Sequence, residues 1–135
     1  MQSLEYLDAW MFLSVARSEG GTLFDFFSAA DHIGVALPTD REMEDGINHL
    51  AKYGLVRPSD TFVALTDTGR ELFEGVGGLA AAPRPQIVLV RERLQAFPLA
   101  QDDVPRWKLD PVESDSALSK YSKRMKSLMK GEREL

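Results

Sequence analysis

One stretch, LAKYGLVRPSDTFVALTDTGRELFE (residues 50–74), constrains the fold of this chain more than any other part of the sequence. Gly54 predicts a helix end, because glycine readily adopts the left-handed backbone conformation that terminates helices. Two short apolar runs, Leu55–Val56 and Phe62–Leu65, predict two strands, since the proline, serine and aspartate between them favour a turn. The Thr-Asp pair that follows caps another helix. We therefore expect a helix, a hairpin and a second helix in this order.

Two helices are expected at the start of the chain. Ser3 is the expected N-cap of a helix over residues 4–18, in which apolar residues recur at helical spacing and which a Gly-Gly pair ends. Thr22 and Asp25 form a capping-box-like start for a second helix. Because Gly34 follows a strongly apolar stretch, we expect it to cap this helix in the left-handed conformation.

A third helix is expected near residues 40–53. Thr39 and Glu42 have the spacing of a capping box, in which each side chain binds the backbone N–H group of the other residue. Gly46 lies in the middle of this helix and weakens it by about 1 kcal/mol relative to alanine. Residues 1–76 are thus expected to form one domain.

The remaining residues, 77–135, are expected to form a linker and a helical extension that packs on this domain or on a second subunit. The stretch GVGGLAAAPRP (75–85) has the composition of a hinge or linker. Two further helices are expected, at residues 85–97 and 111–130. The loop between them is expected to be pinned by Trp107.

Both of these helices have apolar residues at alternating spacings of three and four, which is typical of a short coiled-coil seam. Gly131 is expected to end the second helix. Neither helix is long enough to be stable alone in water, so each must bury its apolar stripe. We expect the two stripes to pack together, within one chain or across a homodimer. The stripes are Ile87, Val90, Leu94 and Phe97 in the first helix, and Leu118, Tyr121, Met125 and Leu128 in the second.

The stretch INHLAKYGLVRPSDTFVALTDTGRELFE resembles winged helix-turn-helix proteins, in which the recognition helix ends in L-x-x-x-G-L-V and the second wing strand ends in L-T-x-x-G-R. The resemblance covers residues 4–76. It implies a mainly α fold with a small two-stranded β wing, in the order α-α-α-β-β-α, followed here by two C-terminal helices. The matching residues are Leu50, Gly54, Leu55 and Val56 in the first motif, and Leu65, Thr66, Gly69 and Arg70 in the second.

Residues 28–56 are also similar to small, uncharacterised bacterial winged-helix proteins, many of which have a tryptophan and a tyrosine-bearing helix near the C-terminus. This resemblance implies the fold and no particular activity. Winged helices also serve as pure protein-interaction modules, so the fold alone does not define a ligand.

Charge is distributed unevenly along the chain. Residues 1–79 contain five Lys/Arg and thirteen Asp/Glu, a net charge of −8, whereas residues 80–135 contain eleven and eight, a net charge of +3. Nucleic-acid-binding proteins usually concentrate basic residues on the surface that meets the phosphates. Residues 1–79, which we call the front of the chain, have instead a net negative charge.

The third helix would lie in the major groove of DNA if the resemblance extended to function. Its first turns, however, contain four carboxylates and a single base, and the expected wing offers a single arginine. Carboxylates repel phosphates and release no counterions, so DNA reading by this helix is disfavoured. The acidic cluster suits a basic partner or a cation, or it is simply a solvated helix face. The candidate partner-binding residues are Arg41, Glu42, Glu44, Asp45 and Arg57.

The basic C-terminal segment is the other candidate surface. Its side chains suit phosphates, or the acidic third helix of a neighbouring subunit, although they also fit the solvated side of an amphipathic helix. The candidate phosphate contacts are Lys120, Lys123, Arg124, Lys126 and Lys130.

Enzymatic activity is not expected. The chain has no cysteine, and His32 and His49 lack a third metal ligand or a nucleophile at a suitable spacing. We expect His32 to interact with the end of a helix and His49 to be a half-buried polar residue. GVGG (75–78) follows a helix rather than a strand, which is the wrong context for a dinucleotide site. Neither a metal nor a cofactor is therefore expected.

The N-terminus has no basic stretch before its apolar residues, and no apolar run reaches the roughly 20 residues of a membrane span, so a cytoplasmic protein is expected. The leading hypothesis is a winged-helix protein that acts through protein–protein contacts in regulation, with an unidentified protein partner and as a homodimer. The alternative is a DNA-binding transcriptional regulator that contacts phosphates through its basic C-terminal segment.

Overall fold

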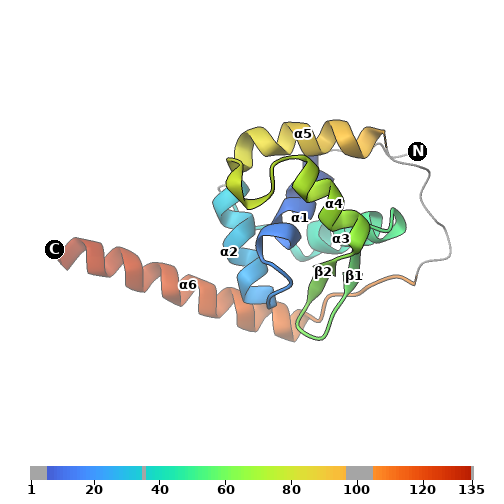
Figure 1. Ribbon diagram of the computed structural model, residues 1–135. Coiled ribbons are helices and arrows are strands. Elements are labelled where there is room, and N and C mark those ends of the chain that lie inside the picture. Colours follow the sequence, from blue (N-terminus) through green and yellow to red (C-terminus); the bar gives the residue numbers. More distant parts are fainter. Residues whose placement is uncertain (1–5, 35, 97–104, 135) are drawn as a thin grey trace.

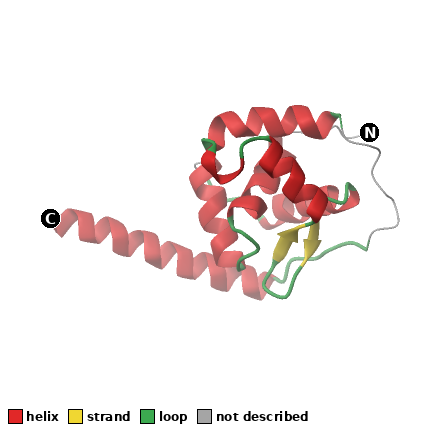
Figure 2. Cartoon of the chain, viewed as in Figure 1, coloured by secondary structure: helices red, strands yellow, loops and turns green. Residues whose placement is uncertain are grey.

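The computed structural model describes residues 6–34, 36–96 and 105–134, and the side chains of the last helix as far as Leu128. This part of the chain is mainly helical with a small two-stranded antiparallel sheet (Figures 1 and 2), as the sequence predicted. The elements are α1 (Tyr6–Arg17), α2 (Leu23–Gly34), α3 (Asp40–Lys52), β1 (Val56–Pro58), β2 (Val63–Leu65), α4 (Asp67–Gly75), the 3-10 turn η1 (Gly78–Ala80), α5 (Pro83–Gln95) and α6 (Pro111–Glu134).

The hairpin forms where two strands were predicted. β1 and β2 pair antiparallel, with Val56 opposite Leu65. The Ser59 N–H group donates to the Phe62 carbonyl at 3.0 Å and closes the connecting turn. Pro58, which was expected in the turn, instead ends β1. A proline is tolerated there because both strands of a two-stranded sheet are edge strands.

Three predicted helix boundaries are confirmed. The Glu42 N–H group donates to Thr39 Oγ1 at 3.1 Å, and the Thr39 N–H group donates to Glu42 Oε1 at 2.9 Å, which completes the capping box of α3. Thr66 caps α4, because its Oγ1 accepts from the Gly69 N–H group at 3.1 Å. Gly54 follows α3 with a φ angle of 72°, the left-handed conformation that glycine adopts without strain.

Two helical glycines have a packing role that the sequence did not predict. Gly34 is the last residue of α2 and lacks the left-handed backbone expected of it. A Cβ atom there would lie 2.7 Å from Trp10 Cε2, so glycine is needed for the approach of the Trp10 ring. A Cβ atom at Gly46 would lie 2.5 Å from Met11 Cγ. Glycine therefore lets α3 pack closely on α1, which offsets its weak helix propensity.

Helix α1 is the centre of the molecule. Its residues 8–16 are all buried, and α2, α3 and α5 pack around it (Figure 1). The Trp10 Nε1–H group donates to the Ala30 carbonyl at 2.9 Å and fixes α1 against α2. Residues 8–16 of α1 are therefore unavailable to a partner.

The stretch predicted as a hinge is folded against this core. It contains η1 and the start of α5, which begins at Pro83 rather than at residue 85. Gln86 is fully buried; its Nε2 donates to the Gly78 carbonyl at 2.9 Å, and its Oε1 accepts from Arg17 Nη2 at 2.7 Å. Burial lowers the pKa of Arg17 below its usual value. These hydrogen bonds tie the stretch to α1.

The two C-terminal helices pack on different neighbours, contrary to the expectation that their stripes meet. α5 lies on α1, whereas the first half of α6 lies on α2 (Figure 1). α6 also continues through Gly131 to Glu134, so the predicted helix end at Gly131 is wrong. Ser3 and Phe97, expected as an N-cap and as part of the first stripe, lie outside the described residues. The buried residues of the α5 stripe are Ile87, Val90 and Leu94.

Candidate interaction surface on helix α3

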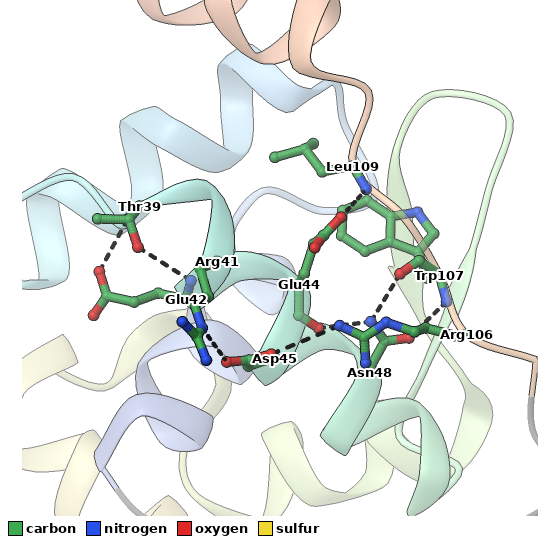
Figure 3. Close-up of polar contacts among 9 residues, drawn as sticks. All are labelled: Thr39, Arg41, Glu42, Glu44, Asp45, Asn48, Arg106, Trp107 and Leu109. Carbon is green, nitrogen blue, oxygen red and sulfur yellow. Dashed lines mark hydrogen bonds and ion pairs between the residues drawn. The ribbon is translucent and has the colours of Figure 1, made fainter.

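One side of α3 is covered by a later part of the same chain. Residues 105–110, which we call the strap, run along this side without forming a helix or a strand, and α6 begins directly after them (Figure 3). The strap contributes backbone groups to the contact, and α3 contributes side chains.

The side chain of Asn48 binds the backbone of the strap. The Trp107 N–H group donates to Asn48 Oδ1 at 2.6 Å, and Asn48 Nδ2 donates to the Trp107 carbonyl at 2.8 Å (Figure 3). The same Nδ2 donates to the Glu44 carbonyl at 2.7 Å, and Asn48 is only 7% exposed. A buried amide with all of these partners is rigid, so Asn48 fixes both the position and the direction of the strap.

Two carboxylates of α3 bind the segment that follows Trp107. Glu44 Oε1 accepts from the Leu109 N–H group at 2.8 Å (Figure 3). Asp40 Oδ1 accepts from the hydroxyl of Ser114, a fully buried residue of α6, at 2.7 Å. These two acidic side chains therefore stabilise the strap and the start of α6.

The apolar side chains of the strap pack on the hairpin and the core. The Trp107 ring meets the Phe62 ring edge-on, with 5.4 Å between the ring centroids. The Phe62 ring in turn packs on the Phe26 ring of the core, with 5.1 Å between the centroids. The side chain of Leu109 is also buried, since the residue is only 8% exposed. The prediction that Trp107 pins the loop of residues 98–110 is confirmed for its described part, residues 105–110.

The remaining candidate residues of α3 and the hairpin have different environments. Asp45 lies 3.8 Å from Arg41 and 3.8 Å from Arg106 of the strap, and both of these ion pairs are exposed. Glu44 and Asp45 thus both contact the strap. The other two candidates are Glu42, which completes the capping box, and Arg57, which is exposed on β1.

Asn48 and Ser114 were not singled out from the sequence. Asn48 lies four residues after Glu44, on the polar side of α3, so the pattern did not distinguish it from a solvated residue. Ser114 follows a proline helix start, where small polar residues are common. No local signal marked either residue, because Trp107, which binds Asn48, and Asp40, which binds Ser114, lie far away in the sequence.

Tyr121 anchors the first half of α6 on α2. Its hydroxyl donates to Asp31 Oδ2 at 2.5 Å, and its ring packs against Phe24 with 6.0 Å between the centroids. The Arg124 guanidinium lies 5.7 Å from the centre of the Phe24 ring. Burial raises the pKa of Tyr121 to about 12, and the hydrogen bond to Asp31 adds to this shift.

Beyond Tyr121, α6 projects from the rest of the molecule (Figure 1), and its described side chains, residues 122–128, are exposed. Met125 and Leu128 are 37% and 56% exposed. Neither α6 nor any other described helix is long and apolar enough to cross a membrane. The side chain of Lys130 lies beyond the described ones. Among the described side chains of α6, the exposed basic residues are Lys120, Lys123, Arg124 and Lys126.

The histidines belong to separate contacts. His49 Nδ1 lies 3.1 Å from both carboxylate oxygens of Asp8. His32 is exposed near the end of α2, and its neighbour Asp31 binds Tyr121. Within the described residues, no group of three or more His, Cys, Asp or Glu side chains is placed to hold a metal ion.

No protein-family model matches this chain, and no curated protein or solved structure matches it either. Its function therefore has to be argued from its own surfaces.

Proposed function

We propose that this chain is a winged-helix protein that acts through protein–protein contacts in regulation. The order of elements supports this fold, because α1, α2 and α3 precede the hairpin and α4 follows it directly. In DNA-binding proteins of this class, the helix that corresponds to α3 enters the major groove.

The strap is the observation that carries the proposal, because it occupies the side of α3 that a DNA reader leaves free. Asn48 and Glu44 are bonded to the strap backbone, and Asp40 is bonded to α6. To enter a DNA groove on this side, α3 would lose these hydrogen bonds and place its carboxylates near phosphates. Both changes cost free energy.

Electrophoretic mobility of a random DNA duplex at low salt tests the proposal. We expect the full chain to leave the duplex unretarded, because α3 offers carboxylates rather than cations. A tight complex that survives Lys123→Gln together with Lys126→Gln would mean that the α3 side binds DNA. That result would refute the proposal.

The basic side of α6 favours a second candidate function, contact with DNA phosphates. Lys120, Lys123 and Lys126 follow one another at intervals of three residues, so they share a broad side of the helix. All three are exposed, and none forms an ion pair with another described residue. Each phosphate contact contributes about 0.9 to the slope of log K against log salt, so each Lys→Gln change should lower the slope by about one unit.

The uncovered part of the α6 stripe is the surface that we propose for a homodimer. Met125 and Leu128 continue the stripe that Tyr121 anchors on α2, and the described part of the chain leaves both of them exposed. An isolated helical segment of this length is marginal in water, so a second subunit would stabilise it.

A further inference from the structure

We propose that the side of α3 beneath the strap, together with Phe62 of the hairpin turn, is a binding site for an extended peptide segment of a partner protein. We call it the strap site, and define it by Glu44, Asn48 and Phe62. The segment that it fits has an aromatic residue and an aliphatic residue two positions later. The strap is the built-in occupant of this site, and the partner displaces it. This inference rests on the proposed function and names the chemistry of the partner.

The strap is bound as an extended peptide would be. Its side chains alternate, since Trp107 and Leu109 face the protein whereas Arg106, Lys108 and Asp110 are exposed. A period of two is the repeat of an extended chain. The backbone N–H groups used in binding, those of Trp107 and Leu109, have the same period.

The hydrogen bonds of the strap site do not depend on the side chains of the strap. Asn48 binds one N–H group and one carbonyl, and Glu44 binds a second N–H group, at 2.6, 2.8 and 2.8 Å. Any extended segment except one with proline at these positions offers the same groups. In peptide recognition of this kind, backbone bonds supply affinity, and alternate side chains supply specificity. Here the aromatic residue is selected by the edge-on contact with Phe62.

The strap is held separately from the helix that follows it. α6 has its own contacts, from Ser114 to Asp40 and from Tyr121 to Asp31. The ion pair of Arg106 with Asp45, in contrast, is exposed and 3.8 Å long. The strap and α6 are therefore held by different side chains, which lets the strap open locally while α6 stays on α2.

Tethering makes the strap a strong competitor for its own site. A segment joined to its site by a short linker has an effective concentration on the order of millimolar. A partner that makes the same contacts therefore competes poorly with an intact strap, and weakening the strap exposes the site.

Fluorescence anisotropy of a labelled peptide PRWKLDP, the sequence of residues 105–111, tests the site. The protein is the full chain with Trp107→Ala, which weakens the strap and leaves Glu44, Asn48 and Phe62 in place. We expect this variant to bind the peptide about tenfold more tightly than the wild type does, because the competing strap has lost its aromatic contact. Equal binding, or none, would overturn the proposal. The peptide with alanine in place of tryptophan is the control, and we expect it not to bind.

Adding Asn48→Ala to Trp107→Ala removes two of the three backbone contacts of the site and leaves the contact of Glu44. We expect the peptide affinity to fall by about tenfold, since two hydrogen bonds to the peptide are lost. The matched control is Glu71→Gln, an exposed residue of α4 outside the strap site, which should leave the affinity unchanged. Peptide binding that is insensitive to Asn48→Ala takes place elsewhere and would overturn the assignment.

Hydrogen exchange of the wild type tests whether the strap opens locally, and it needs no variant, so it applies even if Trp107→Ala fails to fold. We expect the amide hydrogens of Trp107 and Leu109 to exchange about 100-fold faster than that of Leu50 in α3, because the strap opens without global unfolding. Equal protection would show that the strap leaves only when the whole chain unfolds, and would overturn the proposal.

The outcomes separate this inference from the proposed function. If the peptide fails to bind while DNA remains unretarded, the strap site is wrong and the proposed function stands. DNA retardation through α3 would refute the proposed function whatever the peptide does. Self-association of the wild type that disappears with Trp107→Ala would assign the site to a second copy of this chain, and would overturn the proposal of a different partner.

Discussion

Helices α5 and α6 have the same alternation of apolar residues but different environments. In α5, Val90 is fully buried and Leu94 is 1% exposed. In α6, the stripe is covered as far as Tyr121, which is 7% exposed, whereas Leu128 is 56% exposed. The spacing of apolar residues therefore predicts which side of a helix is apolar, but not how much of that side finds a neighbour.

Helix length explains the difference. α5 has 13 residues and lies on α1, which has 12. α6 has 24 residues but lies on α2, which has 12. With a rise of about 1.5 Å per residue, α6 is roughly twice as long as its neighbour, so its second half extends beyond the surface that could cover it.

The same substitution placed on the two stripes tests the comparison, and the larger effect is expected in α5. Leu94→Glu places a carboxylate in the core against α1 and should lower the free energy of unfolding by about 4 kcal/mol or more. Urea unfolding followed by circular dichroism measures this change. A loss below about 1 kcal/mol would mean that α5 is not packed as described. Because Leu94 is buried, this variant reports on folding rather than on a dimer.

Tyr121→Phe tests the boundary between the covered and uncovered halves of α6. It removes the hydroxyl that donates to Asp31 and should lower the free energy of unfolding by about 1.5 kcal/mol, since the acceptor is a carboxylate. Tyr6→Phe is the matched control, because Tyr6 is 45% exposed on α1. An equal effect of the two changes would contradict the anchoring role of Tyr121.

The same tyrosine predicts a pH dependence. Its pKa is raised from 10.0 to about 12 in the folded chain, mainly by burial, so the folded state holds this proton more tightly than the unfolded state. The resulting stabilisation is complete below pH 10 and is lost as the pH rises to about 12. Wild type and Tyr121→Phe should therefore converge in stability over this window, as measured by urea unfolding at each pH. A difference in the free energy of unfolding between the two proteins that stays constant over this window would mean that the Tyr121 phenol lies in solvent.

Leu128→Glu is expected to have the smallest effect on folding of these substitutions. Because Leu128 is exposed, the free energy of unfolding should change by no more than about 0.5 kcal/mol. Sedimentation equilibrium should nevertheless show a dimer for the wild type at tens of micromolar and a monomer for the variant. A monomeric wild type would remove the dimer, and a dimer that is insensitive to Leu128→Glu would use a different surface.

Local rules account for the parts of the fold that could be predicted. The capping box of Thr39 and Glu42, the left-handed Gly54 and the cap at Thr66 all depend on residues within a few positions of one another. The close packing at Gly34 and Gly46, which was not predicted, depends on contacts with α1. A helical position that has no room for a side chain cannot be recognised from its immediate neighbours in the sequence.

The candidate site shows the same division. Glu44 and Asp45 were selected from their charge and helical position, and both contact the strap. Asn48 was not selected, although it makes two hydrogen bonds to Trp107. Charge is visible in a sequence, whereas a neutral amide becomes important only through the groups that it meets.

The sequence by itself determined where the helices and the hairpin lie, which helix sides are apolar, and that the front of the chain is acidic and the back basic. These properties follow from backbone preferences and spacings that act over a few residues. The tertiary structure decided which neighbour each stripe meets and which charges are paired. Asn48 binds a residue 59 positions away, and Tyr121 binds one 90 positions away. Such pairs form because burial of polar groups demands partners, and only the packed chain brings those partners within reach.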